Sequence, residues 1–132
     1  MQQPNIVLDI AKDLRAKISS LNATNAKAGE LPEGRDGIYC VAAPSDEPDR
    51  YTGVIYQTID INARYATDEK AWDVMRSIYP LYQKGEHYET ENCYIYYSNP
   101  LGQIEDLDRD AEGNKLLKLS VQFILRSKTI VS

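Results

Sequence analysis

Apolar side chains recur at helical spacing in two parts of the chain. In residues 5–21 the apolar stripe consists of Ile6, Val7, Ile10, Leu14, Ile18 and Leu21. The other, solvent side of this first helix is expected to hold Asp9, Lys12, Asp13, Arg15 and Lys17. The second helix begins with a cap at Thr67 or Asp68 and kinks or ends near Tyr79, because the proline that follows excludes a regular helix interior. Each helix has one apolar stripe, so both are predicted to pack on a sheet.

The β-strand pattern appears in residues 37–43, 54–65, 93–98 and 116–127. The element order is therefore α-β-β-α-β-β, and consecutive strands without crossover helices form antiparallel hairpins. We predict an α+β fold in one domain over residues 1–132, with a four-stranded, mainly antiparallel sheet and two helices packed on one face. Apolar residues at Val54, Ile55 and Tyr56 predict a bulge or a two-sided contact within the second strand.

Between the last two strands, Asp106, Asp108, Asp110 and Glu112 occupy every second position. A calcium loop of the EF-hand type also needs glycine at its sixth position and glutamate at its twelfth, with a helix on each side. Those two positions are alanine and leucine here, and the flanking segments have strand patterns. We therefore expect a long solvated hairpin connection with no bound metal and no cofactor.

This connection is strongly acidic. Residues 99–114 hold five acids against Arg109 alone, a net charge of −4 in a chain whose total is −5. Apolar Leu101, Ile104 and Leu107 are interleaved with the acids. An acidic segment with apolar side chains can dock a partner, or it can face a channel that must not hold DNA. The candidates for an assembly or lumen-facing role are Glu105, Asp106, Asp108, Asp110 and Glu112.

Tyrosine is unusually frequent: the chain has 10 Tyr against one Phe and one Trp. A tyrosine offers a large apolar contact area with a polar tip, which suits subunit contacts. The candidates for such an interface are Tyr94, Tyr96, Tyr97, Leu101 and Ile104. The 15 basic residues form no run or stripe, so sequence-specific nucleic-acid binding is not expected. No apolar run reaches the roughly 20 residues that span a bilayer, and we expect an intracellular, soluble protein with no membrane partner.

The chain has few groups for catalysis. Cys40 and Cys93, with His87 as the only histidine, cannot complete a four-ligand zinc site of the Cys/His type. The cysteines are expected to be buried thiols in a reducing compartment. A Cys–His nucleophile pair is conceivable, but no convergent nucleophile, base and oxyanion donors are visible in the sequence, and we do not predict an enzyme.

The whole arrangement resembles the small minor capsid and tail-terminator proteins of long-tailed phages and prophages. The resemblance covers residues 6–126. It consists of the N-terminal amphipathic helix, the strands "GIYCVAA" and "GVIYQTIDINARY", the capped helix "TDEKAWDVMRSIYPLY" and the hairpin "YIYYSNP … DAEGNKLLKLSVQFILR". The positions that agree with the family pattern are Arg64, Ala71, Ile78, Leu81, Gly113 and the strand 117–125.

The resemblance implies a structural virion protein of the tail or neck, assembled in the cytoplasm of a bacterial host. Such a protein forms a ring, commonly a hexamer, that caps the tail tube and forms the head–tail joining interface. Its partners would be copies of itself, the tail-tube protein and the head-completion protein, with DNA passing through without sequence-specific binding. If acids 105–112 were repeated sixfold around the lumen, they would repel the DNA phosphates.

Three other interpretations stay open at the level of sequence. The protein could be a head-completion or tail-tube protein of the same neck region. It could be a small monomeric module whose tyrosine-lined surface binds a ligand or peptide. Finally, it could be an enzyme that uses Cys93 or His87.

Overall fold

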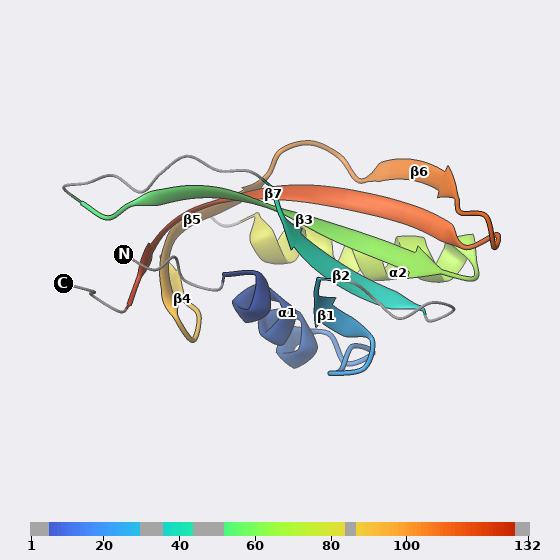
Figure 1. Cartoon of the computed structure of the whole chain (residues 1–132), viewed down its shortest axis with the longest axis horizontal. Coiled ribbons are helices and arrows are strands. Elements are labelled where there is room, and N and C mark those ends of the chain that lie inside the picture. Colours follow the sequence, from blue (N-terminus) through green and yellow to red (C-terminus); the bar gives the residue numbers. More distant parts are fainter. Residues whose placement is uncertain (1–5, 30–35, 44–51, 84–86, 129–132) are drawn as a thin grey trace.

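The computed structural model describes residues 6–29, 36–43, 52–83 and 87–128 (Figure 1). The elements are α1 (Ile6–Lys17), β1 (Ala26–Ala28), β2 (Gly37–Ala42), β3 (Ile55–Tyr65), α2 (Asp68–Ile78), the 3-10 helix η1 (Tyr79–Tyr82), β4 (Tyr88–Glu89), β5 (Cys93–Pro100), β6 (Glu105–Arg109) and β7 (Lys115–Ser127). No helix in these ranges is long and apolar enough to cross a bilayer.

The sheet is larger than the sequence predicted. Its seven strands follow the order β1-β2-β3-β7-β5-β4, and β6 pairs with β7 outside this path. β1 is parallel to β2, and the other pairs are antiparallel, so the sheet is mixed. The α+β class is right, but the four-stranded, mainly antiparallel sheet is wrong. The additional strands are β1, β4 and β6, edge strands of at most five residues, which are too short to show a periodicity of their own.

β7 is the centre of the sheet. One of its edges pairs with β3 along residues 115–125, and the other pairs first with β6 and then with β5. Residues from Lys115 to Leu125 alternate between buried and half-buried side chains, as the sequence pattern predicts. The pairing of β3 with β7 runs without a register shift, so the bulge expected near Tyr56 is absent from β3. Below the long strands β3 and β7, Figure 1 shows both helices.

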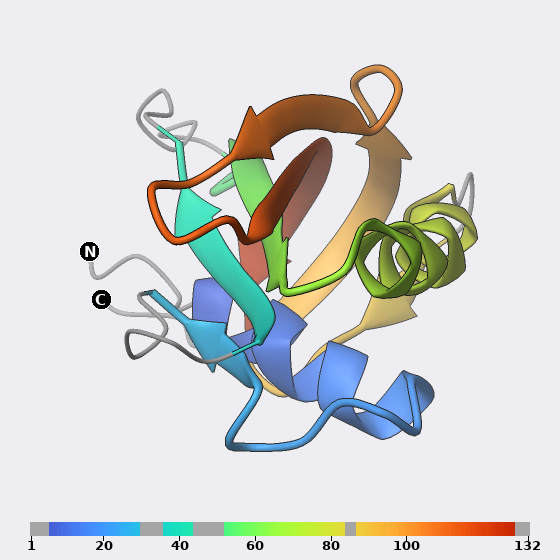
Figure 2. The same cartoon turned by 90° about the vertical axis from the view of Figure 1, so that its right-hand side faces the viewer.

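α1 closes the open side of the curled sheet (Figure 2). Its apolar side packs on β1 and β2, and one of its carboxylates, Asp9, reaches the β4–β5 turn at the other edge of the sheet. Asp9 is only 2% exposed and accepts hydrogen bonds from Thr90 Oγ1 (2.6 Å), from the backbone N–H of Asn92 (2.8 Å) and from Asn92 Nδ2 (2.7 Å). The expectation that Asp9 faces solvent is therefore wrong. Asp9 ties α1 to the turn between β4 and β5.

α2 begins where the sequence predicts. The hydroxyl oxygen of Thr67 accepts a hydrogen bond from the backbone N–H of Lys70, which caps the helix. The proline that ends it lies in η1, which places Tyr82 in the core with no exposed surface. The Tyr82 ring meets the edge of Phe123 at a centroid distance of 5.6 Å, and its hydroxyl donates to Asp13 over 2.9 Å. Burial, together with Asp13, raises the pKa of Tyr82 well above its ordinary value.

Candidate assembly surfaces

The acidic segment forms the edge strand β6 and the turn that leads into β7. All five residues of β6 are exposed, and the strand lies at the right-hand end of the molecule in Figure 1. Glu105 pairs with Lys118 and Asp106 pairs with Leu117, and then the register shifts to Arg109 and Lys115. We call residues 105–113 the acidic hairpin.

Two of the predicted acids have basic partners on β7. The carboxylate of Asp106 lies 2.5 Å from the ammonium of Lys115, whose side chain is only 8% exposed. The carboxylate of Glu105 lies 3.8 Å from the ammonium of Lys118, where both side chains face solvent. The hydrogen bond from Lys115, followed by one from the backbone of Asp108, lowers the pKa of Asp106. Asp106 is therefore part of the scaffold, because its removal would leave a buried ammonium without a partner.

A third acid shapes the turn. Asp110 Oδ1 accepts hydrogen bonds from the backbone N–H groups of Glu112 and Asn114, both over 2.9 Å. The bond from Asn114 is the main reason that the pKa of Asp110 is lowered. Gly113 has a φ of 86° and completes the turn in a conformation that glycine adopts without steric cost. Arg109 holds the hairpin to α2, since its guanidinium pairs with Asp68 and donates to the Gly113 carbonyl over 2.6 Å.

The two remaining acids are free of such contacts. Within the described ranges, neither Asp108 nor Glu112 has a basic partner, and both are exposed. Asp108 has a φ of 70°, a left-handed backbone that is uncommon for a residue other than glycine. Beside it, Leu107 is 45% exposed. The acidic hairpin is thus not a uniform negative surface, and the available groups are Leu107, Asp108 and Glu112. The described residues include no group of three or more His, Cys, Asp or Glu that could hold a metal ion.

The predicted tyrosines lie on β5, whose register is shifted between Ile95 and Tyr97. Because of this shift, both Tyr96 and Tyr97 turn away from the core, while Cys93 and Ile95 remain buried. Tyr94 is 38% exposed and Tyr97 is 37% exposed.

The outward side of the sheet continues this surface across three strands. In the sheet register Tyr97 faces Ile124 on β7, and Ile124 faces Tyr56 on β3. Tyr56 is 53% exposed, and sequence reasoning did not select it as an interface residue. The signal was present, since apolar side chains on both sides of the early β3 segment predict a two-sided contact.

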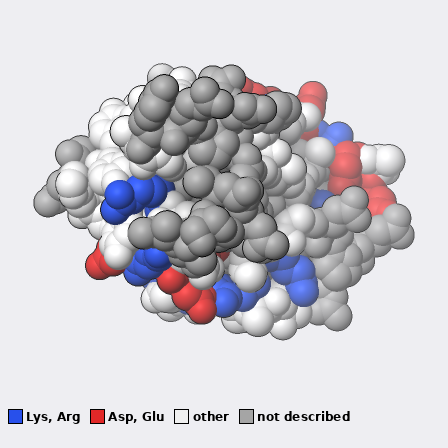
Figure 3. Space-filling view, turned by 60° about the vertical axis from the view of Figure 1, so that its left-hand side comes forward, with Lys and Arg blue, Asp and Glu red and all other residues white. Residues whose placement is uncertain are grey.

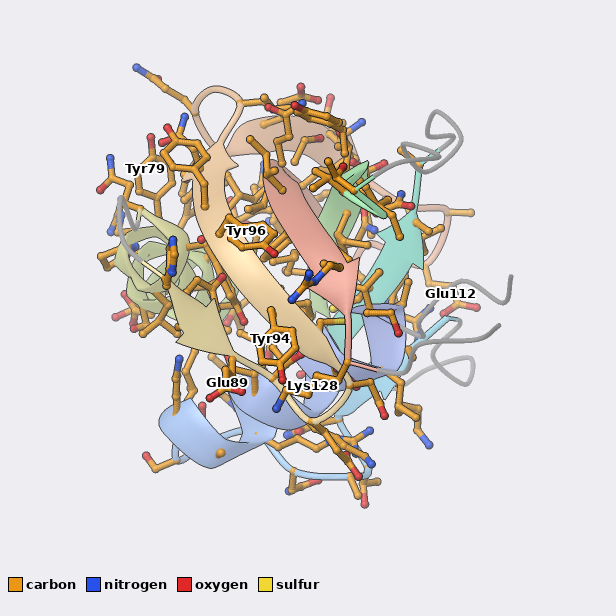
Figure 4. The ribbon with its side chains drawn as sticks, turned by 90° about the vertical axis from the view of Figure 1, so that its left-hand side faces the viewer. Tyr79, Glu89, Tyr94, Tyr96, Glu112 and Lys128 are labelled. Atoms are coloured by element: carbon orange, nitrogen blue, oxygen red, sulfur yellow. The ribbon has the colours of Figure 1, made fainter. Side chains whose placement is uncertain are left out.

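A groove with a volume of about 390 Å³ lies beside these tyrosines. Its lining residues are His87, Tyr88, Glu89, Tyr94, Ile95, Tyr96 and Arg126. We call it the aromatic groove. The guanidinium of Arg126 and the ammonium of Lys128 lie 5.5 and 5.4 Å from the centre of the Tyr94 ring. Lys128 also pairs with Glu89 over 3.1 Å, and Figure 4 shows Tyr94, Glu89 and Lys128 gathered at this end of the sheet.

Leu101 and Ile104, the other interface candidates, lie in the connection from β5 to β6. Leu101 is 55% exposed, and its backbone N–H donates to the Ser120 carbonyl over 2.8 Å. Ile104 is only half-exposed and packs against the core. The structure therefore divides the interface candidates: the tyrosines lie on β5, and Leu101 and Ile104 lie in the connection that leads to the acidic hairpin. The aromatic groove lies at one end of the sheet and the acidic hairpin at the other (Figures 1 and 4).

The cysteines lie where thiolate chemistry is disfavoured. Both thiols are buried, and burial raises the pKa of Cys40 to about 12 and that of Cys93 to about 11. The exposed His87 ring meets the edge of the Tyr96 ring at a centroid distance of 5.4 Å. Neither cysteine lines the aromatic groove to which His87 belongs.

One family comparison gives a match. The family model described as bacteriophage tail terminator protein matches residues 8–127. The matched segment extends from the first turn of α1 to the end of β7 and includes every strand of the sheet. This confirms the resemblance drawn from the sequence. Comparison with curated proteins gave no match.

Proposed function

The chain belongs to the bacteriophage tail terminator family, and from this we propose that copies of it close into a ring, a hexamer, that caps the tail tube and joins the tail to the head. The family is a structural one, and its members are components of the virion tail. The observation that carries the proposal is the match over residues 8–127, which covers nearly all of the described fold rather than one short motif.

The surfaces of the molecule support self-association. The aromatic groove combines the exposed Tyr94, two half-buried tyrosines and an arginine, which is the composition of interface centres. The two candidate surfaces differ from each other and lie at opposite ends of the sheet (Figures 1 and 4). A contact between unlike surfaces of identical subunits is heterologous, and it generates closed rings when the rotation between neighbours closes.

The proposed ring has three kinds of partner besides its own subunits. One side of the ring binds the tail-tube protein, the other binds the head-completion protein, and DNA passes through the lumen. The chain has a net charge of −5, and the face in Figure 3 shows blue and red side chains in separate small groups, with no continuous blue area among the described residues. This distribution supports passage of DNA without sequence-specific binding.

The mass of the purified protein in solution tests the proposal. A hexamer has six times the 15.0 kDa mass of the chain, and light scattering and native mass spectrometry measure it directly. Electron microscopy should show closed rings, and addition of the protein to growing tails should stop them at uniform length. Long filaments would indicate a tail-tube protein, and binding to heads alone would indicate a head-completion protein. A 15.0 kDa species at every concentration would contradict the ring and favour the monomeric binding module.

A further inference from the structure

We propose that the aromatic groove of one copy receives the acidic hairpin of the next copy, with Leu107 entering beside Tyr94 and Tyr96, and Asp108 meeting Arg126. This inference rests on the proposed function and names the subunit contact of the ring. It also gives the acidic hairpin an assembly role in place of a lumen-facing one.

One cation of the groove has no anionic partner among the described residues. Beside the groove, Lys128 already pairs with Glu89, the carboxylate of its lining. Arg126 is exposed and lies over Tyr94, and no carboxylate among the described residues pairs with it. An arginine held against an aromatic ring keeps guanidinium N–H donors for a second partner, and a carboxylate matches their geometry.

The acidic hairpin supplies the complementary groups. Its shifted register leaves Leu107 and Asp108 without registered partners on β7. Leu107 offers an exposed apolar side chain between two acids, and a 390 Å³ groove walled by Tyr94, Tyr96 and Ile95 is large enough to take it. Asp108 and Glu112 form no ion pair with a described cation, whereas Asp106 pairs with Lys115.

The positions of the two surfaces prevent the hairpin from entering the groove of its own chain. The groove and the hairpin lie at opposite ends of the long axis, so they meet only between molecules (Figures 1 and 4). Each copy then presents one hairpin and one groove, which is the geometry of a head-to-tail ring. A lumen-facing hairpin would instead be expected to keep all its acids free, and three of the five are engaged within the chain.

A charge swap tests the contact. We expect Arg126→Glu and Asp108→Lys each to raise the dissociation constant between subunits by about tenfold or more, because like charges then face each other. Mixing the two single variants should also recover assembly, because in a ring that alternates them each Arg126→Glu groove meets an Asp108→Lys hairpin, and each unchanged groove meets an unchanged hairpin. The double variant Arg126→Glu, Asp108→Lys restores an opposite-charge pair and should recover assembly. Light scattering across a concentration series measures all four proteins, and thermal unfolding verifies that each is folded.

Two matched controls lie on α2. Arg76 is exposed and stacks over Trp72 at 5.5 Å, much as Arg126 stacks over Tyr94. Asp73 is an exposed aspartate on the same helix. Arg76→Glu and Asp73→Lys change the net charge by the same amounts as the test variants, and both should assemble like the wild type.

A disulfide gives a second, covalent readout of the same contact. A chain with Leu107→Cys and Arg126→Cys carries its new thiols at opposite ends, so an oxidised bond between them must link two copies. Since Cys40 and Cys93 are buried, they should not compete. We expect a ladder of linked chains on a non-reducing gel that ends at the ring size, and no ladder from either single variant.

The outcomes separate this contact from the proposed function. Rings that persist in both single charge variants, with no disulfide ladder, would overturn the contact and leave the ring intact. A folded double variant that stays dissociated would also overturn it. A wild-type protein that is monomeric at every concentration would overturn both proposals.

Discussion

Asp9 on α1 and Asp108 on β6 carry the same carboxylate in opposite surroundings. Asp9 is 2% exposed and accepts three hydrogen bonds from the β4–β5 turn. Asp108 is exposed and makes no side-chain contact with a cation in the described part of the chain. A buried carboxylate without hydrogen-bond donors would be strongly unfavourable, so the bonds that Asp9 accepts stabilise the fold. The carboxylate of Asp108 is hydrated, so it contributes little to the free energy of folding. The difference between structural and available acids therefore depends on their partners.

The largest loss of stability should come from a substitution in the hydrophobic core, on which α1 and β7 both depend. Phe123 is fully buried and touches the Tyr82 ring. We expect Phe123→Ala to lower the free energy of unfolding by about 3–5 kcal/mol, because it leaves a cavity in the centre of β7. Denaturant unfolding measures the loss, and Tyr56→Ala on the outward side of the sheet is the control. Equal losses from both variants would show that the inner side is not the core.

Asp9→Ala should come next. It leaves the hydroxyl of Thr90 and two donors of Asn92 without their acceptor, and we expect a loss of about 2–3 kcal/mol. Asp73→Ala on exposed helix surface is the matched control and should change stability by no more than about 0.5 kcal/mol. If the two variants melted alike, the comparison between buried and available carboxylates would not hold.

Loss of the Asp106 carboxylate should lower stability less than loss of Asp9 and more than loss of Asp108. Asp106→Asn leaves the ammonium of Lys115, whose side chain is 8% exposed, without a counter-charge. Lys115→Met removes that buried charge and leaves Asp106 accessible to water. We therefore expect Asp106→Asn to lower the melting temperature more than Lys115→Met. The reverse order would show that the pair contributes through Asp106 rather than through burial of the lysine.

Acid should weaken the hairpin in a defined direction. The pKa values of Asp106 and Asp110 are lowered in the folded chain by hydrogen bonds to their carboxylates. The unfolded chain then takes up these protons first, so the stabilisation is complete at neutral pH and declines as the pH falls below about 4, through the folded pKa values. Melting temperatures from pH 7 to pH 3 measure it. Asp110→Asn should show a smaller acid-dependent decrease than the wild type, and an unchanged decrease would contradict the role of the turn.

The smallest effect on folding is expected at Asp108. Asparagine tolerates the left-handed backbone, so Asp108→Asn should change the free energy of unfolding by less than about 0.5 kcal/mol. If the hairpin docks on Arg126 of a neighbour, the same variant should still weaken subunit association. A large loss of stability would place Asp108 with Asp9 as a structural acid.

The sequence predicted the long elements well because each repeats a simple period. Strand β7 alternates over 13 residues, and the capped helix α2 begins at its predicted boundary. The edge strands β1, β4 and β6 have two to five residues each, so tertiary pairing rather than periodicity defines them. The candidate residues were mostly identified from composition, but their division into paired and available acids depends on Lys115 and Lys118 across the hairpin.

Taken alone, the sequence determined the family, the α+β class, the long helices and strands, and the position of the acidic and tyrosine-rich segments, because these properties follow from local patterns along the chain. Only the tertiary structure decided the mixed, curled sheet, the outward turn of Tyr96 and Tyr97, and the burial of Asp9. It also placed the groove and the hairpin at opposite ends (Figures 1 and 4). The reason is that each of these features depends on contacts between residues far apart in the sequence, as between Asp9 and Asn92, and no local pattern encodes such a contact.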